Sequence, residues 1–282
     1  MKICMNCMTA YQDTCGVCPA CGYQEGQDGP PENELAPGSI LQKRYIVGCL
    51  RIEEESEFTY MGWDELFQRR VLIREFFLPG QCVRQEGGRV AGEDELFGQW
   101  VEEFVQGGKQ LIRLYREPDI LTAYSAFKEN GTGYIVTEYM IDQVLLDAQE
   151  SRYETGQAVR LFVRILEAME KCHNEGLCFG KIAPFQVYCL GDQVVLAGQR
   201  PGGLGRRRED VEWAAVLFCR MVLGLDYNFS KGRLERDLKA LRPPLGKEQI
   251  QILMLLLESG KPPAMSAGEL MEIFEEAVFQ EV

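Results

Sequence analysis

Residues 129–139 read Glu-Asn-Gly-Thr-Gly-Tyr-Ile-Val-Thr-Glu-Tyr, and this stretch indicates how the first half of the chain folds. Asn130-Gly131 is a two-residue turn signal, and the apolar runs 120–127 and 134–139 lie on either side of it, as the strands of a hairpin would. Three earlier runs are also rich in Val, Ile, Tyr and Phe: residues 44–49, 58–64 and 70–76. The pattern predicts five strands, with a helix over residues 95–114 between the third and the fourth.

The second half of the chain, after Met140, is predicted to be mostly helical. Apolar side chains recur on one helical face between residues 158 and 169, and residues 211–225 are apolar on most sides, as in a buried central helix. Residues 250–257 form another predicted helix, and a last one opens with the capping box Ser266-x-x-Glu269. A β-rich lobe followed by a helical lobe is an α+β, two-lobed fold.

The overall charge and the lack of long apolar runs narrow the classes of partner. The chain has 282 residues and a formal net charge of −13, which repels a phosphate backbone, so we expect no nucleic-acid partner. No apolar run approaches the roughly 20 residues that span a bilayer, and no signal peptide opens the sequence, so we expect no membrane partner and a cytoplasmic location. Thiols stay reduced there, so the cysteines are predicted metal ligands or buried thiols.

Five cysteines lie in the first 21 residues: Cys4, Cys7, Cys15, Cys18 and Cys21. A segment this short cannot bury a hydrophobic core and needs another stabilising element. Cys4-x2-Cys7 and Cys18-x2-Cys21 are two thiolate pairs, and two such pairs complete a tetrahedral zinc site. The spacing predicts a zinc ribbon over residues 1–24 with a structural Zn²⁺, because four thiolates leave no open coordination position.

Cys15 leaves an alternative ligand set, because Cys15-x2-Cys18 has the same spacing. Pro19 preorganises the turn between Cys18 and Cys21, and Gly22 allows the positive φ that follows such a turn. We therefore assign the second pair to Cys18 and Cys21, which makes Cys15 a spare thiol.

Two further segments follow the ribbon. Residues 25–40 combine Gly, Pro and acidic residues without apolar periodicity, which predicts a flexible linker. The body, residues 41–282, resembles bacterial serine/threonine protein kinases, especially those with an N-terminal zinc ribbon. The matching strings are Arg44-Tyr45-Ile46, residues 59–64, 71–77 and 129–139, His173-x-x-Gly176-Leu177 and Asp210-Val211-x-Trp213-Ala214. The resemblance implies an N-lobe over residues 41–140 and a C-lobe over 141–282. The hinge between them would be Glu138, Tyr139 and Met140.

The same resemblance implies that the nucleotide-binding positions of the N-lobe are replaced. In protein kinases a Gly-rich loop covers the phosphates, and a lysine of the third strand contacts them. The three loop glycines correspond to Ile52, Glu54 and Glu57, so carboxylates lie where phosphates would bind. Arg74 stands at the lysine position, and Gly107 stands where the helix glutamate that pairs with the lysine would be.

The catalytic positions of the C-lobe are replaced as well. The proton-accepting aspartate corresponds to Lys181, which reverses the charge, and the metal-binding asparagine corresponds to Gln186. The metal-binding aspartate corresponds to Gly198, so no carboxylate remains at that position to hold Mg²⁺. Residues 201–209 then leave too little chain before Asp210 for an activation segment of the usual length.

Two polar residues of the C-lobe are expected to serve the fold. Asp210 matches the family's aspartate that braces the backbone of the catalytic loop, and the resemblance implies the same role here. His173, the single histidine, is predicted to be a packed residue at the end of a helix.

These replacements together predict a pseudokinase that has no catalytic residue and binds neither ATP nor Mg²⁺. Its function would be that of a protein-interaction or regulatory scaffold in signalling, and its partner another protein, such as an active kinase or its substrate. The alternative is an atypical serine/threonine kinase or nucleotide-binding protein that uses displaced residues. Glu102 or Glu103 could then pair with the arginine in a shifted helix, and Asp192 or residues 53–57 could hold a metal.

Overall fold

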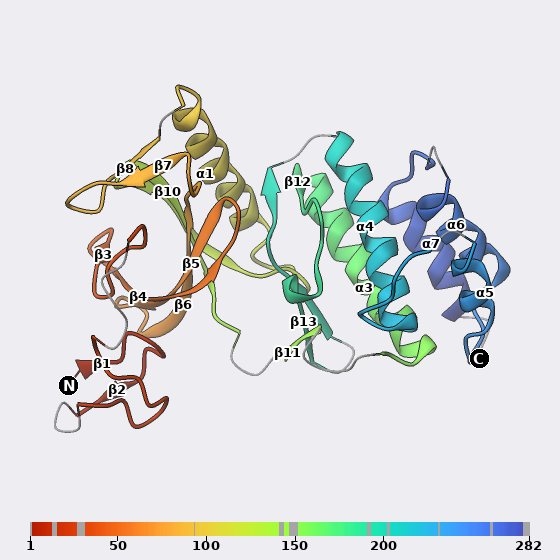
Figure 1. Cartoon of the computed structure of the whole chain (residues 1–282), viewed down its shortest axis with the longest axis horizontal. Coiled ribbons are helices and arrows are strands. Elements are labelled where there is room, and N and C mark those ends of the chain that lie inside the picture. The colour runs from red at the N-terminus through yellow and green to blue at the C-terminus, as the bar shows by residue number, and fades with distance from the viewer. Residues whose placement is uncertain are drawn as a thin grey trace. The chain divides into compact units, whose positions relative to one another are not determined.

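Two compact units make up the chain (Figure 1). The computed structural model describes residues 2–12, 16–26, 32–92, 94–140, 144–146, 152–190, 193–201, 204–230, 232–259 and 262–278. The first unit comprises Met1–Ile112 and Thr122–Tyr139, and we call it the β-rich unit. The second, the helical unit, comprises Arg113–Leu121 and Met140–Val282.

An antiparallel sheet of six strands forms the centre of the β-rich unit, in the order β3-β4-β5-β6-β10-β9. The strands are β3 (Ile40–Leu41), β4 (Tyr45–Glu53), β5 (Glu57–Asp64), β6 (Arg69–Phe76), β9 (Ala123–Glu129) and β10 (Thr132–Glu138). Asn130 and Gly131 connect β9 to β10 with φ values of 51° and 75°. Both values are positive, so these residues form the tight hairpin turn that the sequence predicts.

Helix α1 (Phe97–Arg113) approaches this sheet closely because glycines lie at the contact. A Cβ atom on Gly108 of α1 would lie 2.7 Å from Cβ of Ala126 and 2.7 Å from Cγ1 of Ile135. A Cβ atom on Gly133 of β10 would lie 2.8 Å from Cγ2 of Val105. No larger side chain fits at either position without displacing its neighbours, so the two glycines set the distance between helix and sheet.

A buried carboxylate joins the sheet to a small hairpin between β6 and α1. Glu75 of β6 accepts hydrogen bonds from the hydroxyls of Tyr60 and Tyr134, each at 2.7 Å, and from Nη2 of Arg84 at 2.6 Å. Arg84 ends β7 (Cys82–Arg84), which pairs with β8 (Val90–Gly92). This hairpin was not predicted, because strands of three residues carry too little periodicity to be read from sequence.

Asp64 is a second buried carboxylate, at the end of β5. Arg44 donates from Nε to Oδ1 and from Nη2 to Oδ2, both at 2.8 Å. The N–H groups of Leu66 and Phe67 also donate to Oδ1. Burial alone would raise the pKa of Asp64, but these hydrogen bonds and the charge of Arg44 hold it below its ordinary value.

The helical unit is built on α3 (Thr155–Asn174), α4 (Leu204–Leu223) and α7 (Ala267–Val278). Each contributes one fully buried ring, and the centroids of Phe162, Phe218 and Phe274 lie 4.8–5.0 Å apart. Helices α5 (Leu234–Lys239) and α6 (Lys247–Leu257) and the 3₁₀-helix η1 (Pro184–Gln186) complete the described helices of this unit. The predicted capping box opens α7, since Glu269 Oε2 accepts from the N–H of Ser266 at 2.7 Å and Ser266 Oγ accepts from the N–H of Glu269 at 3.1 Å.

Short strands also occur in the helical unit, where the sequence predicts almost none. They are β11 (Val144–Leu145), β12 (Leu177–Cys178), β13 (Val187–Leu190), β14 (Gln193–Leu196) and β15 (Arg200–Pro201). The predicted strand 120–127 also begins later, at Ala123, because Ile120 forms a bridge with Leu196 of β14 instead. The α+β class predicted from the order of strands and helices is nevertheless confirmed.

Candidate functional sites

The four predicted zinc ligands lie on two turns of the same construction. In the first, the N–H of Met8 donates to the carbonyl of Cys4 at 2.8 Å, and in the second the N–H of Gly22 donates to the carbonyl of Cys18 at 2.9 Å. The residue that closes each turn has a positive φ, 56° at Met8 and 73° at Gly22. Strands β1 (Lys2–Ile3) and β2 (Ala10–Tyr11) pair on either side of the first turn.

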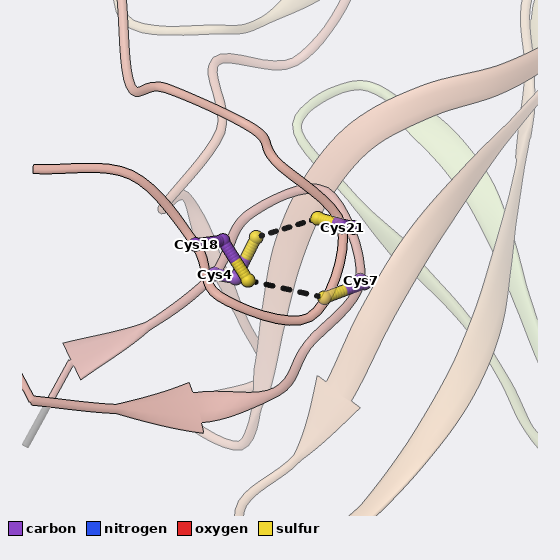
Figure 2. A group of neighbouring side chains, drawn as sticks. All are labelled: Cys4, Cys7, Cys18 and Cys21. Atoms are coloured by element: carbon purple, nitrogen blue, oxygen red, sulfur yellow. Dashed lines mark hydrogen bonds between the residues drawn. The ribbon is translucent and has the colours of Figure 1, made fainter. Parts of the chain in front are cut away.

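The two turns bring four sulfur atoms together, as Figure 2 shows. Sγ of Cys4 lies 3.6 Å from Sγ of Cys21, Sγ of Cys7 lies 3.7 Å from Sγ of Cys18, and all four are within 4.8 Å of one another. Zinc–thiolate bonds of about 2.3 Å in a tetrahedron put sulfurs about 3.8 Å apart. The four cysteines could therefore hold a zinc ion. Cys15, the alternative ligand, lies outside the described residues.

Two of these cysteines, Cys4 and Cys21, differ in acidity. Burial raises the pKa of the Cys4 thiol to about 12. At Cys21 burial acts in the same direction, but the backbone N–H of Tyr23 and the side chain of Asn6 donate to the sulfur and bring its pKa to about 6. A bound cation would offset the cost of burying a thiolate at Cys4.

The ribbon contacts the sheet of the β-rich unit. The N–H of Cys49 in β4 donates to the carbonyl of Met5 at 2.8 Å, and Nη2 of Arg70 in β6 donates to Oγ1 of Thr9 at 2.8 Å. A Cβ atom on Gly48 would lie 2.2 Å from the Met5 carbonyl oxygen, so only glycine permits this approach. The ribbon and the sheet are thus joined by backbone and side-chain hydrogen bonds.

The described end of the predicted linker is also attached to this sheet. Leu35 is buried, and its N–H donates to the hydroxyl of Tyr60 at 3.1 Å. The carbonyl of Asn33 accepts from Nε of Arg84 at 2.7 Å. These contacts differ from what a freely mobile tether would make, because residues 33–35 have fixed partners. The domain boundaries themselves stay a prediction.

Arg74 and Glu57, two of the replaced nucleotide-binding positions, form a buried ion pair. Arg74 donates from Nε to Oε2 of Glu57 at 2.7 Å and from Nη2 to Oε1 at 2.9 Å. Of the other loop positions, Ile52 pairs with Thr59 in the sheet, and the N–H of Glu54 donates to the carbonyl of Glu57 at 2.9 Å. The segment that corresponds to the Gly-rich loop is therefore a tight turn between β4 and β5.

Sequence reasoning treated Arg74 and Glu57 as two separate losses and missed their pairing. A signal was present, since the two replacements carry opposite charges at positions that a kinase fold would bring together. Gly107 of α1 is buried and has no side chain to offer Arg74. Two acids, Glu102 and Glu103, could have replaced the missing glutamate. Both bind other side chains instead, Glu102 that of Lys128 and Glu103 that of Gln99.

Lys181, at the position of the proton-accepting aspartate, stands over an aromatic ring. Its Nζ lies 4.7 Å from the ring centroid of Trp213, a cation–π contact. The sequence did not predict this aromatic partner.

Gln186 and Gly198, at the two metal-binding positions, lie against each other. A Cβ atom on Gly198 would lie 2.2 Å from Nε2 of Gln186, and Gly198 has a φ of +84°. Oε1 of Gln186 accepts from the N–H of Ala183 at 2.9 Å, and the Gln186 carbonyl accepts from the N–H of Ala197 at 2.9 Å. The amide thus stabilises the loop and fills the space beside Gly198.

Asp210 is fully buried and organises the loop that contains Lys181. Oδ2 accepts from the N–H of Phe179 at 2.9 Å and lies 2.8 Å from Nε2 of His173, while Oδ1 accepts from the N–H of Gly180 at 2.5 Å. His173 and Cys178 lie close enough to Asp210 to share an ion with it, but the carboxylate oxygens are already engaged in these hydrogen bonds. The contacts agree with the structural roles expected of Asp210 and His173.

The predicted hinge begins at Glu138, the last residue of β10. Glu138 pairs with Val71, and its N–H donates to the carbonyl of Thr122 at 2.9 Å. The chain passes from the β-rich unit to the helical unit between Tyr139 and Met140, within the predicted hinge.

Comparisons with known proteins show what this chain is similar to. No protein-family model matches the chain. Serine/threonine-protein kinase PknG of Mycolicibacterium smegmatis is 25% identical over 64% of this chain, and the match spans 22% of that protein's length. Among solved structures, the kinase domain of Mycobacterium tuberculosis PknI aligns with a TM-score of 0.62 at 17% identity, covering 86% of this chain and 99% of the domain.

The chain has a protein-kinase-like fold. A structure described as the PpkA-294 apo form agrees, with a TM-score of 0.62 at 18% identity over 87% of this chain and 99% of that one. The likeness to PknG supports the resemblance of this kinase-like chain to bacterial serine/threonine protein kinases. Within the described residues, no helix combines the length and apolar character needed to cross a membrane.

Proposed function

We propose that this chain is a catalytically inactive kinase-like protein, a pseudokinase, that acts in the cytoplasm as a protein-interaction or regulatory scaffold in signalling. The observation that carries the proposal is Lys181, which stands where protein kinases have the proton-accepting aspartate. Its ammonium group faces the ring of Trp213. A protonated lysine cannot accept the proton of a substrate hydroxyl, and loss of a general base alone typically slows a reaction by about 10²–10⁴-fold.

The two metal-binding positions support the same conclusion. Magnesium prefers carboxylate and other hard oxygen ligands. Gly198 offers no side chain, and the one amide oxygen of Gln186 already accepts a hydrogen bond from Ala183. A kinase-like chain without the base and without the metal carboxylate lacks the charge neutralisation on which phosphoryl transfer depends.

The retained fold beside these replaced positions favours a function carried by the surface. Asp210 and its hydrogen bonds are intact although the base next to them is absent. Fold and activity are separable, because activity depends on the site. We propose that the partner is another protein, such as an active kinase or its substrate, and that the ribbon contributes to the surface it meets.

The alternative is an atypical serine/threonine kinase or a nucleotide-binding protein, and the likeness to PknG favours it. Of the displaced residues that it would need, Asp192 lies outside the described residues, and Glu57 of the acidic run bonds to Arg74. The proposal and the alternative differ in what they predict for ATP.

The deciding experiment is a phosphotransfer assay on the full chain with radiolabelled ATP, with Mg²⁺ and with Mn²⁺, using the chain itself and a generic protein as acceptors. We expect no incorporation above an Arg74→Met control. Transfer that Arg74→Met or Lys181→Met abolishes would overturn the proposal and establish the alternative. A thermal shift with millimolar ATP, with and without metal, separates binding from chemistry, because a ligand that binds the folded state raises Tm.

A further inference from the structure

The Arg74–Glu57 pair has a geometry that arginine also uses to bind phosphate. Two parallel hydrogen bonds join the side chains, Nε to Oε2 at 2.7 Å and Nη2 to Oε1 at 2.9 Å. Guanidinium groups recognise carboxylates and phosphates in this same planar, bidentate way. Glu57 therefore gives Arg74 the hydrogen bonds that a nucleotide phosphate would otherwise give it.

The pair is closed to solvent. Arg74 is 6% exposed and Glu57 is 2% exposed. Burial alone would lower the pKa of Arg74, but the charge and hydrogen bonds of Glu57, with the charge of Glu54, raise it. The guanidinium carbon also lies 5.9 Å from the ring centroid of Phe104. Arg74 is therefore a buried cation whose charge is balanced by a carboxylate of the same chain.

The carboxylate is held in place by the sheet. In the pairing of β5 with β6, Thr59 lies opposite Arg74 and Glu57 lies opposite Phe76. The N–H of Glu54 donates to the Glu57 carbonyl and closes the turn that precedes it. Glu57 is thus part of the ladder, so an anion that reaches Arg74 must compete with a carboxylate that is already positioned beside it.

We propose that Glu57 is a built-in counter-anion for Arg74, and that it excludes phosphate groups from the kinase-like β-rich unit. The inference rests on the proposed function in one respect, the equivalence of Arg74 to the kinase lysine. It goes further because it assigns the exclusion to one carboxylate. The chain contains a latent site for polyphosphate, the chemical class of a nucleoside triphosphate tail, and removal of Glu57 opens it.

The test uses Glu57→Gly in the full chain, which restores glycine at the third loop position. This variant leaves a buried guanidinium without its counter-charge, so we expect its Tm to fall well below that of the wild type. Sodium tripolyphosphate should then raise the Tm of Glu57→Gly by several degrees in a concentration-dependent way, since a ligand that binds the folded state stabilises it. The wild type should show no shift at the same ionic strength.

The matched control is the double variant Glu57→Gly/Arg74→Met, which removes both charges. Its Tm should lie above that of Glu57→Gly and should not respond to tripolyphosphate. Calorimetry should give at least a tenfold tighter Kd for tripolyphosphate with Glu57→Gly than with either the wild type or the double variant. Equal binding by wild type and Glu57→Gly would overturn the proposal, and so would equal responses of Glu57→Gly and the double variant.

If Glu57→Gly does not fold, the same comparison is made with the isosteric Glu57→Gln against Glu57→Gln/Arg74→Met. A tripolyphosphate shift confined to the variant that keeps Arg74 supports the inference, and equal shifts refute it. These measurements report binding only. Phosphotransfer by the wild type would refute the proposed function, whereas a missing response in the Glu57 variants would refute only the counter-anion.

Discussion

The ribbon and the kinase-like body differ in which residues occupy their predicted functional positions. In the ribbon, Cys4, Cys7, Cys18 and Cys21 are all present, and their sulfurs lie within 4.8 Å of one another. In the body, the positions that the resemblance assigns to phosphate, proton and metal carry other residues. Arg74, Glu57 and Gln186 among them bond to neighbouring parts of the protein. One region has its predicted ligands assembled, and in the other several predicted positions take part in packing and internal pairing.

The difference shows that replaced positions can lie in well-ordered surroundings. Arg74 pairs with Glu57, and the Gln186 amide lies against Gly198. Arg74 and Glu57 balance each other's charge, and the Gln186 amide fills the space beside Gly198. We therefore expect the ribbon to depend on a metal and the body to depend on these internal contacts.

The largest expected effect is removal of the metal from the ribbon. Cys18→Ser should abolish binding of one zinc ion per chain and unfold the ribbon, because structural zinc sites contribute about 10–16 kcal/mol at neutral pH. Zinc content by atomic emission and hydrogen exchange of residues 2–24 would measure the two effects. Exchange should also rise at the N–H of Cys49, which donates to Met5.

Cys15→Ser is the matched control for the ribbon, since it changes the cysteine that the sequence assigns as spare. It should keep its zinc. Zinc loss in Cys15→Ser with retention in Cys21→Ser would show that the second ligand pair is Cys15 and Cys18.

The ribbon cysteines could be predicted because metal coordination imposes a spacing that is visible in sequence. The fold could be predicted too, since the turn at Asn130-Gly131 and the strands around it follow period-two and turn rules. The Arg74–Glu57 pair was missed although its opposite charges were a signal, because pairing between side chains distant in sequence leaves no periodic trace. The contact between Gly48 and Met5 depends on backbone approach, which a sequence does not display either.

The next largest effect concerns Asp210, which accepts a hydrogen bond from the backbone next to Lys181. Asp210→Ala should destabilise the helical unit by about 3–5 kcal/mol, because each buried donor left without an acceptor costs about 1–3 kcal/mol. It leaves the N–H groups of Phe179 and Gly180 without their acceptor. Asp210→Asn should cost less because one acceptor oxygen remains. Urea unfolding measures both, with the exposed Glu209→Ala as control on the same helix, and a neutral Asp210→Ala would refute the structural role.

A smaller effect is expected when an aspartate is introduced at Gly198, the predicted position of the metal-binding carboxylate. Gly198→Asp should destabilise the protein by about 1–3 kcal/mol, because a non-glycine residue is strained at a positive φ. The added Cβ would also collide with the Gln186 amide. Gln186→Asn shortens that side chain, so Gln186→Asn/Gly198→Asp should be more stable than the sum of the single changes predicts. If urea unfolding shows that the destabilisation of the double variant equals the sum of the two single variants, the side chains at positions 186 and 198 do not affect each other.

The smallest effect concerns the contribution of the buried Asp64 charge to the free energy of unfolding. Burial alone would raise the pKa of Asp64, but hydrogen bonds from Arg44 and from the N–H groups of Leu66 and Phe67, with the charge of Arg44, together hold it below its ordinary value. A carboxylate with a lowered folded-state pKa stabilises the protein above the unfolded-state pKa of about 3.9, and this stabilisation is lost as the pH falls through the folded-state value. Wild type should therefore exceed Asp64→Asn in free energy of unfolding by about 1–3 kcal/mol at neutral pH, as for hydrogen bonds to a charged group. The gap should narrow below about pH 4.

Urea titrations of the two proteins across this range measure the gap directly, and other carboxylates cancel because both proteins contain them. A gap that stays constant with pH would mean that the Asp64 charge contributes nothing and that only the shape of the side chain matters.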